Sequence, residues 1–424
     1  MQLSKWRWWA GLLGTLFVVP WSTEAAVPVQ VRVRWLRDQT SLTIQGEHLR
    51  LEPFQNLTDK SAQPVGLQTT SRSFRIERVL RQGKPLWHIL ELLTRQGQVL
   101  PPRHYFSGTP LLLLQGKHNR VGSWAAPDAI VLQAHRGKLD AIGLIPLEDY
   151  IMGVVAKEMP TQWSAEALKA QAVAARSYTM AILQERAHEL VQMESSVLDQ
   201  VFSPLSEAEV QTEALRKVRQ AVQDTQGLQL LTGSGQPLKA FYHADCGGRT
   251  VSSASVFGIA GISGGVVDQS CPLHTQSHWQ YHVRRQDLVH LMVDKGIWSS
   301  ASDGTTAELQ AVQDSQSKRV KELVLKTENG LVAKIRAEVL REWLGYRNIR
   351  STLFHIEATS EGWILKGQGY GHGVGLCQRG AQDLAQHGAD FIAILRHYYP
   401  QSQIQTGLQA REDLQSEKAH REQE

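Results

Sequence analysis

The segment "GQGYGHGVG" at residues 367–375 constrains the fold more than any other, because glycine occupies every second position. Glycine weakens helices and strands alike, so such a run is tolerated mainly where the backbone bends sharply or approaches another group closely. A dinucleotide fingerprint needs a third glycine five residues after the first, and a P-loop needs a lysine after its last glycine. The run supplies neither. It therefore predicts a groove for something other than a nucleotide.

The size and charge of the chain set broad limits on its class. The 424 residues include 42% hydrophobic residues, which is enough for a large core and predicts two domains. The 45 basic residues nearly balance the 41 acidic ones. A nucleic-acid-binding surface would need a denser positive charge, so we expect no nucleic-acid partner.

The N-terminus has the pattern of a secretory signal peptide. Lys5 and Arg7 precede an apolar run at residues 8–20, and small residues follow up to Ala25 and Ala26. We expect residues 1–26 to be a signal peptide and the protein to be exported to the periplasm or cell wall. An uncleaved anchor is the alternative, although the run is short for spanning a bilayer. No membrane span is expected after cleavage.

The order of the patterns along the chain predicts an α+β fold. Residues 27–140 alternate apolar and polar side chains, which predicts a β-rich region that opens with a hairpin over 27–56 and has no helix before Tyr150. A mixed α/β domain over 141–402 is expected to follow. Its predicted elements are a helix over 165–187 capped by Ser164, a helix over 206–225, a hairpin around Gly233–Gly235, and two helices separated by Gly388 and Asp390 and stopped by Pro400. Residues 403–424 are predicted to be a charged, disordered tail.

Glu158 is the first candidate for chemistry. It follows the apolar pair Val154–Val155 and precedes Met159 and Pro160. Because Pro160 disfavours helix at the residue before it, we expect Glu158 in a turn just upstream of a helix. Desolvation by apolar neighbours would raise its pKa and favour the protonated acid. The alternative is a surface glutamate near a helix N-terminus.

Three segments in the same order resemble the stage II sporulation protein D (SpoIID)/LytB amidase enhancer family. They read "LEDYIMGVVAKEMPTQWSAEALKAQAVAARSYT", "LKAFYHADCGGRT" and "GQGYGHGVGLCQRGAQ", and the resemblance covers about residues 140–400. It implies an exported protein whose partner is the glycan of peptidoglycan. Sporulation members of this family are lytic transglycosylases that cut peptide-stripped glycan strands. Other members were described as enhancers of a cell-wall amidase, which would then be a second partner.

The resemblance also implies roles for individual residues. Glu158 corresponds to the catalytic acid of the family. The positions implied to bind substrate are Arg176, Tyr242, His243, Gly371, His372, Gly373 and Gln378, and for Arg176 the alternative is an ordinary helix-surface arginine. No cofactor and no metal are implied for the reaction.

A single carboxylate is enough for a lytic transglycosylase, whereas the usual hydrolytic route needs two. One acid protonates the glycosidic oxygen and then removes a proton from the 6-hydroxyl of the sugar, which closes an anhydro ring. Glu148, Asp149 and Glu166 are candidate second acids. The first two precede a predicted strand and Glu166 falls in the first turn of a helix, which explains them without chemistry.

The chain departs from the family pattern in two places. Phe202 stands where many members have tyrosine, so a polar glycan contact through that hydroxyl is in doubt. The preceding residues "MESSVLDQ" lack the cysteine and histidine with which some members bind zinc.

The three cysteines, Cys246, Cys271 and Cys377, leave one thiol over after any pairing. Outside the cytoplasm we expect Cys246 and Cys271 to form a disulfide. The alternatives are free thiols, or a zinc site made by His243, Cys246, Cys271 and His274, with His278 following. Cys377 is interpreted as a small buried packing residue.

Overall fold

The computed structural model of the protein describes residues 29–54, 67–68, 73–92, 94–95, 98–99, 101, 103–109, 111–262, 265–268, 277–300, 308–328, 330 and 332–406. The predicted signal peptide, Cys271, His274 and residues 407–424 lie outside these ranges. The signal peptide and the pairing of Cys246 with Cys271 therefore stay predictions.

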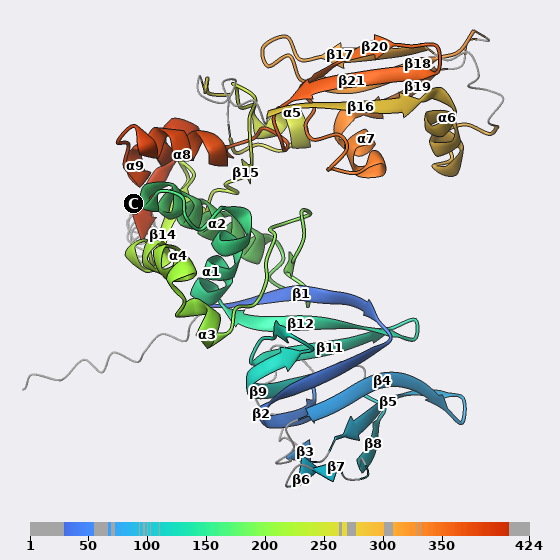
Figure 1. The fold of residues 1–424 in the computed structure, drawn as a ribbon, viewed down its shortest axis with the longest axis vertical. Coiled ribbons are helices and arrows are strands. Elements are labelled where there is room, and N and C mark those ends of the chain that lie inside the picture. The colour runs from blue at the N-terminus through green and yellow to red at the C-terminus, as the bar shows by residue number, and fades with distance from the viewer. Residues whose placement is uncertain are drawn as a thin grey trace, which may run out of the picture.

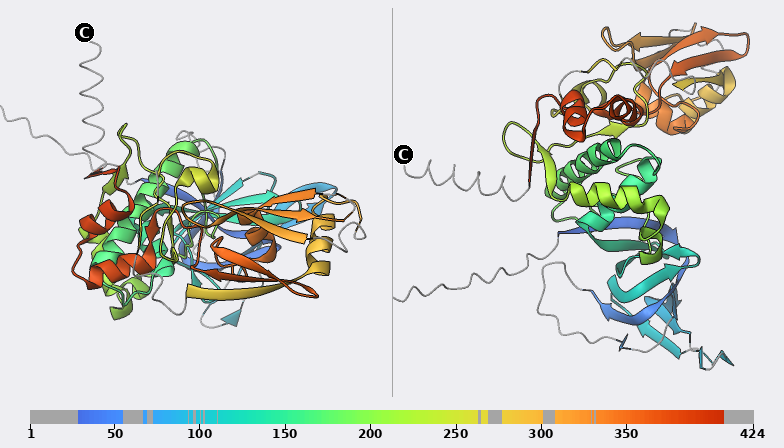
Figure 2. Two further views of the ribbon diagram at one scale, coloured as in Figure 1. Left: turned by 90° about the horizontal axis from the view of Figure 1, so that it is seen from above. Right: turned by 60° about the vertical axis from the view of Figure 1, so that its left-hand side comes forward.

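A layer of helices lies between two β-sheet regions, as two of the views show (Figures 1 and 2). The N-terminal strands form one end, the helices α1, α2, α4, α8 and α9 form the middle, and strands from residues 278–368 form the other end. The protein contains both helices and strands, with a β-rich N-terminal region, which confirms the predicted α+β class. Among the described residues, no helix is both long enough and apolar enough to cross a membrane.

The N-terminal sheet joins eleven strands of the described chain, in the order β13-β1-β12-β11-β9-β2-β4-β5-β8 with β10 and β3 paired at its side. The strands are β1 Gln30–Gln39, β2 Ser41–Pro53, β3 Leu67–Gln68, β4 Ser73–Arg81, β5 Lys84–Glu91, β8 Arg103–Ser107, β9 Leu111–Val121, β10 Trp124–Ala125, β11 Ala129–His135, β12 Lys138–Pro146 and β13 Met193–Glu194. The short strands β6 Thr94–Arg95 and β7 Gln98–Val99 pair with each other.

The predicted hairpin over residues 27–56 is wrong. Both halves are strands, but β1 pairs with β12, and β12, β11 and β9 separate it from β2. Alternation of apolar and polar residues fixes which face of a strand is buried, not which strand lies beside it. The buried face is as expected, since residues such as Leu42, Ile44 and Ile76 form the core of this sheet.

The helical layer contains α1 Leu147–Glu158, α2 Ala165–Glu185, α3 Glu207–Val210, α4 Glu213–Asp224, α8 Gln378–Gln386 and α9 Phe391–Tyr398. The prediction of no helix before Tyr150 is wrong, because α1 begins at Leu147. Its β-branched residues and Gly153 give a weak local helix signal. Burial of Tyr150, Ile151 and Val154 in the core of this layer supplies what local propensity lacks.

The remaining helix predictions are confirmed in outline. α2 begins after Ser164, as predicted, but the Ser164 side chain makes no capping hydrogen bond to the described residues. Asp390 does cap α9, by accepting the Ala393 N–H at 2.7 Å. The single helix predicted over 206–225 is instead the pair α3 and α4. A capping box at Ser206 starts α3, and Thr212 precedes α4, so two start signals lie inside the predicted range.

Short strands tie this layer together. After β14 Leu228–Leu231 the chain turns at Gly233–Gly235, and one isolated bridge pairs Leu231 with Pro237 across this turn. The longer pairing of β14 is with β23 Gln403–Thr406. The first residues of the predicted disordered tail are therefore a strand. β15 Tyr242–His243 runs parallel to β22 Leu376–Cys377.

The second β region contains two three-stranded sheets, β16-β21-β20 and β17-β18-β19. Its elements are β16 His278–Arg284, α6 Arg285–Asp294, β17 Glu308–Gln313, β18 Val320–Lys326, β19 Val332–Arg336, α7 Ala337–Leu344, β20 Phe354–Ala358 and β21 Gly362–Gln368. The helix α5 Ser253–Phe257 precedes it. Apolar side chains that include Trp279, Trp298 and Trp363 form a separate core here.

Candidate functional site

Glu158 is the last residue of α1, not a residue of a turn as predicted. The next residue, Met159, is extended with φ −126° and ψ 147°, because the ring of Pro160 disfavours the helical conformation there. The helix therefore ends at the carboxylate. The negative end of the helix dipole lies at this terminus and disfavours ionisation of an acid placed there.

Glu158 as a residue is partly exposed, whereas its carboxyl group is desolvated. Burial raises its pKa above the ordinary value, and this outweighs three contacts that lower it. The first of these contacts is the backbone N–H of Val201, which donates to Oε1 at 2.8 Å. The other two are the side chains of Gln378 and Tyr242. The site thus favours the protonated acid.

Several buried polar atoms around Glu158 lack a hydrogen-bond partner among the described residues. They are the hydroxyls of Tyr150 and Tyr242 and the Nε2 of Gln171. Although Tyr242 lies close enough to lower the pKa of Glu158, the geometry of its hydroxyl satisfies no hydrogen bond. Leaving such a group unpaired costs about 1–3 kcal/mol, so these atoms can accept a polar ligand or water without breaking an existing bond.

The parallel pair β15 and β22 brings Tyr242 and Gln378 to Glu158. Tyr242 lies opposite Leu376, and His243 lies opposite Cys377, the residue before Gln378. Gln378 is buried and donates from Nε2 to Gln171 Oε1 at 3.3 Å. Two segments that are far apart in sequence therefore place their side chains on one carboxylate.

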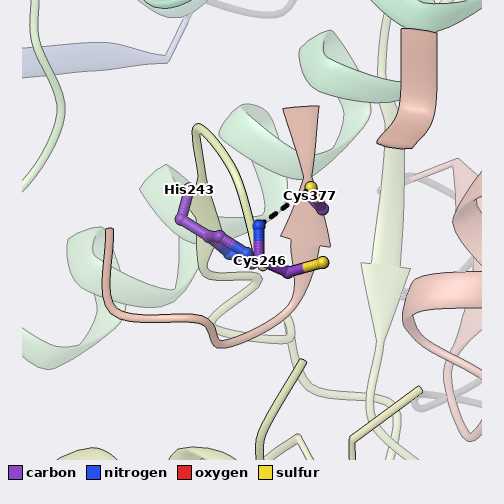
Figure 3. Close-up of side chains that lie close together, drawn as sticks. All are labelled: His243, Cys246 and Cys377. Carbon is purple, nitrogen blue, oxygen red and sulfur yellow. Dashed lines mark hydrogen bonds between the residues drawn. The ribbon is translucent and has the colours of Figure 1, made fainter. Parts of the chain in front are cut away.

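Cys246 lies beside the ends of these two strands (Figure 3). Among the described residues, His243, Cys246 and Cys377 offer ligand atoms within 4.8 Å of one another, and Asp38, His135 and Asp140 form a second such group. In the second group His135 already contacts Asp38 at 3.0 Å. His278, which follows the alternative zinc ligands in the sequence, belongs to neither group. Cys377 is buried, as predicted.

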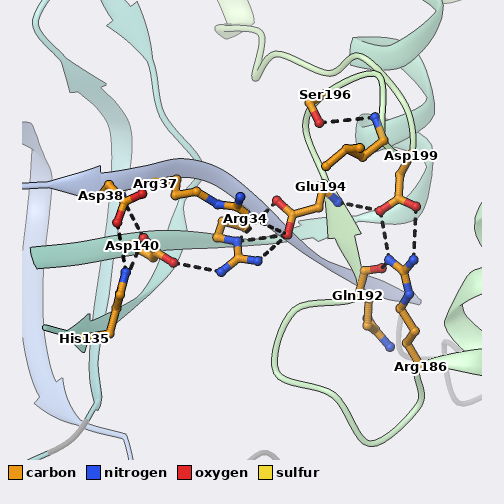
Figure 4. Close-up of polar contacts among 11 residues, drawn as sticks. Arg34, Arg37, Asp38, His135, Asp140, Arg186, Gln192, Glu194, Ser196 and Asp199 are labelled. Atoms are coloured by element: carbon orange, nitrogen blue, oxygen red, sulfur yellow. Dashed lines mark hydrogen bonds and ion pairs between the residues drawn. The ribbon is translucent and has the colours of Figure 1, made fainter. Parts of the chain in front are cut away.

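A chain of polar contacts fixes the loop that carries Val201 (Figure 4). Glu194 of β13 forms ion pairs with Arg34 and Arg37 of β1. Asp199 accepts the Glu194 N–H at 2.9 Å and pairs with Arg186 at 2.8 Å. The N-terminal sheet thus positions the N–H that binds Glu158. Sequence reasoning missed Val201, because a backbone donor leaves no signature in the side-chain pattern.

Arg176 lies in the interior of the helical layer, with its side chain 0% exposed. Its Nε and Nη2 donate to Glu148 at 2.9 and 2.6 Å, and its Nη1 donates to the Leu228 carbonyl at 3.1 Å. The alternative of a helix-surface arginine is wrong. None of these contacts involves Glu158, so a contact between Arg176 and substrate stays a prediction without a visible route to the surface.

The three candidate second acids have other surroundings. Glu148 pairs with Arg176, and Glu166 bonds to Lys169 and accepts the Phe391 N–H at 2.8 Å. Asp149, whose pKa burial raises, lies in the first turn of α1. At 1.5 Å per residue that turn is about 14 Å along the helix from Glu158. Within the part of the chain that the structure describes, the groups that shift the pKa of Glu158 include no other carboxylate.

The glycines of residues 369–375 pack against other parts of the same chain. Gly371 and Gly373 have φ of 114° and 83°. A Cβ on Gly371 would lie 2.6 Å from the Cβ of His243, and one on Gly373 would lie 2.5 Å from the Arg319 guanidinium. Glycine is therefore required here by the conformation and by close packing. Contact of these two glycines with a sugar stays a prediction.

His372 and His243 lie in the same packed region. His372 Nδ1 accepts the Val374 N–H at 3.0 Å, and its ring packs against Phe241 and Phe257. Burial lowers the pKa of His372 to about 3. His243 is buried, and its Nδ1 lies 3.1 Å from the Val374 carbonyl. Both imidazoles are therefore neutral at physiological pH.

The substitution at Phe202 has a packing explanation. The ring is buried and lies 4.9 Å from the ring of Tyr150, centroid to centroid. Its neighbour Gln200 is bonded to Thr179 and to the Ala175 carbonyl. Residue 202 therefore belongs to the core beneath Glu158.

Two segments of the chain match known protein families. Residues 135–231 match the family described as SpoIID, stage II sporulation protein, and residues 271–375 match a domain of unknown function, DUF8618. The first match contains Glu158 and α2.

Three relatives match over a longer range. An uncharacterized protein of Brachyspira hyodysenteriae is 32% identical over 60% of this chain and 65% of its own length. Stage II sporulation protein D of Bacillus subtilis is 28% identical over 65% of this chain and 79% of its own length. The amidase enhancer of Bacillus subtilis is 27% identical over 59% of this chain.

The match covers 39% of the length of the amidase enhancer, so this chain spans less than two thirds of that relative and of the Brachyspira protein. The family match and the names of the relatives point to the same family as the three sequence motifs. Residues 135–231 thus match SpoIID, and the relatives support the resemblance to the stage II sporulation protein D/amidase enhancer family.

Proposed function

We propose that this protein is an exported peptidoglycan lytic transglycosylase that cleaves peptide-stripped glycan with Glu158 as its only acid and base. The observation that carries the proposal is the Glu158 carboxyl group, which has a pKa raised by burial and a single N–H on Oε1. The names of the relatives support a role at the cell wall. The predicted signal peptide over residues 1–26 would place the protein in the periplasm or cell wall.

In the proposed reaction, protonated Glu158 gives its proton to the glycosidic oxygen as the bond to the anomeric carbon breaks. The 6-hydroxyl oxygen of the same sugar then bonds to that carbon, and its proton returns to Glu158. The product has a 1,6-anhydro-muramic end, the acid is regenerated, and no water is consumed. The Val201 N–H stabilises the carboxylate between these steps, and Tyr242 and Gln378 would bind hydroxyl or amide groups of the sugar.

Hydrolysis is less well supported, because it normally needs a second carboxylate at a defined separation from the acid. The nearest candidates by sequence, Glu148, Asp149 and Glu166, are paired elsewhere or lie at the far end of α1. Anhydro ends, rather than reducing ends, are therefore the expected products.

The second candidate function is that of a non-catalytic enhancer, which binds glycan and a partner amidase. The relative named amidase enhancer favours it. Both functions would use the same glycan-binding residues, so only the products of a digest separate them.

The test is digestion of purified peptide-stripped glycan by the wild-type protein and by Glu158→Gln. The amide keeps the shape of the side chain but cannot donate the acid proton, and such catalysis contributes about 10²–10⁴-fold. We expect anhydro-muramic ends from the wild type and at least about a hundredfold fewer from the variant. Glu213→Gln, an exposed site at the start of α4, is the control and should match the wild type.

Release of anhydro ends by Glu158→Gln at the wild-type rate would show that another group is the acid. If the wild type gives no anhydro ends alone but accelerates an added cell-wall amidase, the enhancer function replaces the proposed one.

A further inference from the structure

Three potential metal ligands converge behind the Glu158 site. His243 ends β15, Cys377 ends β22, and Cys246 lies in the loop after β15 (Figure 3). All three side chains are buried, and one ligand atom of each lies within 4.8 Å of the others. The proposed function uses neither sulfur.

The imidazole of His243 has one ring nitrogen available to bind a metal ion. Its Nδ1 lies 3.1 Å from the Val374 carbonyl, which assigns the ring proton to Nδ1. Nε2 then has a free lone pair, and it is buried without a hydrogen-bond partner among the described residues. A backbone carbonyl on one ring nitrogen is the usual partner that orients a metal-binding histidine.

Backbone N–H groups surround the two sulfurs. Cys377 Sγ accepts from Cys246 N at 3.3 Å and from Gly380 N at 3.4 Å, and Cys246 Sγ accepts from Gly248 N at 3.3 Å. Cys377 is also the N-cap of α8, where the helix dipole favours a negative charge. Donors to the sulfur and a helix N-terminus both favour the thiolate, the form that binds metals.

The surrounding charges favour a divalent cation. Cys246 Sγ lies 3.6 Å from Oδ2 of buried Asp268, and the buried guanidinium of Arg319 is close enough to both sulfurs to interact electrostatically. With both thiols ionised, Cys246, Cys377 and Asp268 carry three negative charges beside the one positive charge of Arg319, and a divalent ion is attracted to such a cluster.

We propose that His243, Cys246 and Cys377 bind a divalent transition-metal ion, zinc by their donor types. One imidazole and two thiolates form a known zinc donor set that leaves a fourth position for another ligand. Zinc bonds of about 2.0–2.3 Å put tetrahedral donor atoms about 3.5–3.8 Å apart. The three donor atoms lie within 4.8 Å of one another, so they need to approach each other by about 1 Å on binding. Binding releases both thiol protons to the solvent, and Asp268 stays ionised beside Cys246.

The ion has a positioning role in this site. His243 directly follows Tyr242 and Cys377 directly precedes Gln378, the two residues beside Glu158. A metal bond between the ends of β15 and β22 would hold both side chains against the acid. This proposal replaces the Cys246–Cys271 disulfide expected from sequence, and its ligand set differs from the alternative zinc set, which used Cys271 and His274 and left Cys377 out.

The experiment uses the full exported chain, purified, loaded with Zn²⁺ or Co²⁺ and freed of unbound metal. Elemental analysis and native mass spectrometry are expected to give one ion per chain for the wild type and less than a tenth of that for Cys377→Ser. The Co²⁺ form should show a sulfur-to-metal charge-transfer band, and chelation should lower the thermal unfolding temperature. Neither readout depends on glycan cleavage, so the metal site and the proposed function can fail separately.

Cys271→Ser tests the alternative set. Loss of the ion in Cys271→Ser with full retention in Cys377→Ser would overturn the proposal. So would peptide mapping of the metal-treated wild type that finds Cys246 in a disulfide. If Cys377→Ser does not fold, the wild type still decides, because bound Co²⁺ without a sulfur band, or no bound metal at all, contradicts the site.

Discussion

The ion pair between Arg176 and Glu148 gives the sharpest test of whether this family arginine contacts substrate or holds the fold. We consider Arg176→Met and Glu148→Gln as separate variants. Methionine fills most of the space of the arginine stem, and glutamine keeps the shape of the glutamate. The changes therefore remove charge and hydrogen bonds with little change in packing volume.

The structure sets the expected magnitudes. Removing one partner of a buried ion pair costs about 3–5 kcal/mol. Glu148 keeps 30% exposure of its side chain, whereas Arg176 is 0% exposed. Water can therefore solvate Glu148 when Arg176 is removed, and we expect the low end of that range, about 3 kcal/mol, for Arg176→Met. Glu148→Gln leaves a guanidinium charged in the interior, so its loss should be at least as large.

Urea unfolding measures the stability of each variant, and a pull-down on purified peptide-stripped glycan measures binding below the unfolding transition. The control is the exposed pair Glu213 and Arg216, 2.7 Å apart with side chains 78% and 57% exposed. Glu213→Gln and Arg216→Met should each change stability by less than about 1 kcal/mol. We expect both buried-pair variants to lose stability while the folded fraction keeps its glycan binding. Arg176→Met with wild-type stability and no glycan binding would refute this reasoning.

Two further predictions concern the glycine run. Because burial lowers the pKa of His372 from 6.5 to about 3, the unfolded chain takes up this proton first as the pH falls. Neutral His372 therefore contributes its full stability above pH 6.5, and this contribution declines as the pH falls toward 3. The difference between the urea midpoints of the wild type and His372→Gln should accordingly shrink from pH 7 to pH 4. Gly373→Ala should cost more in thermal unfolding than Gly388→Ala, since both have positive φ but only Gly373 faces Arg319; equal losses would contradict the packing argument.

The parts of the fold that local sequence determines were predictable. A run of helix formers after Ser164 is enough to place α2, and Pro160 is enough to exclude helix at Met159. The apolar sequence around Glu158 was enough to predict the rise of its pKa. These signals act over a few residues, so a single sequence contains all of them.

The parts that depend on distant segments were not predictable. α1 has weak local propensity and forms because its apolar face is buried. The partner of β1 is set by the whole sheet, and the ion pair of Arg176 joins residues 28 apart. The Val201 N–H reaches Glu158 only through a loop fixed by Asp199 and Glu194. In each case the deciding contact is between elements, which alternation and propensity do not encode.

The two-residue spacing of the glycine run follows from the same kind of contact. The four glycines 369, 371, 373 and 375 all have positive φ, and a Cβ on any of them would meet residues 241–247 or Arg319. Of the residues between them, His372 packs against Phe241 and Val374 lies in the core, whereas Tyr370 is exposed. The glycine positions themselves have no room for a side chain. Because the run leads directly into Cys377 and Gln378, its close fit against β15 also decides how near Gln378 and Tyr242 come to Glu158.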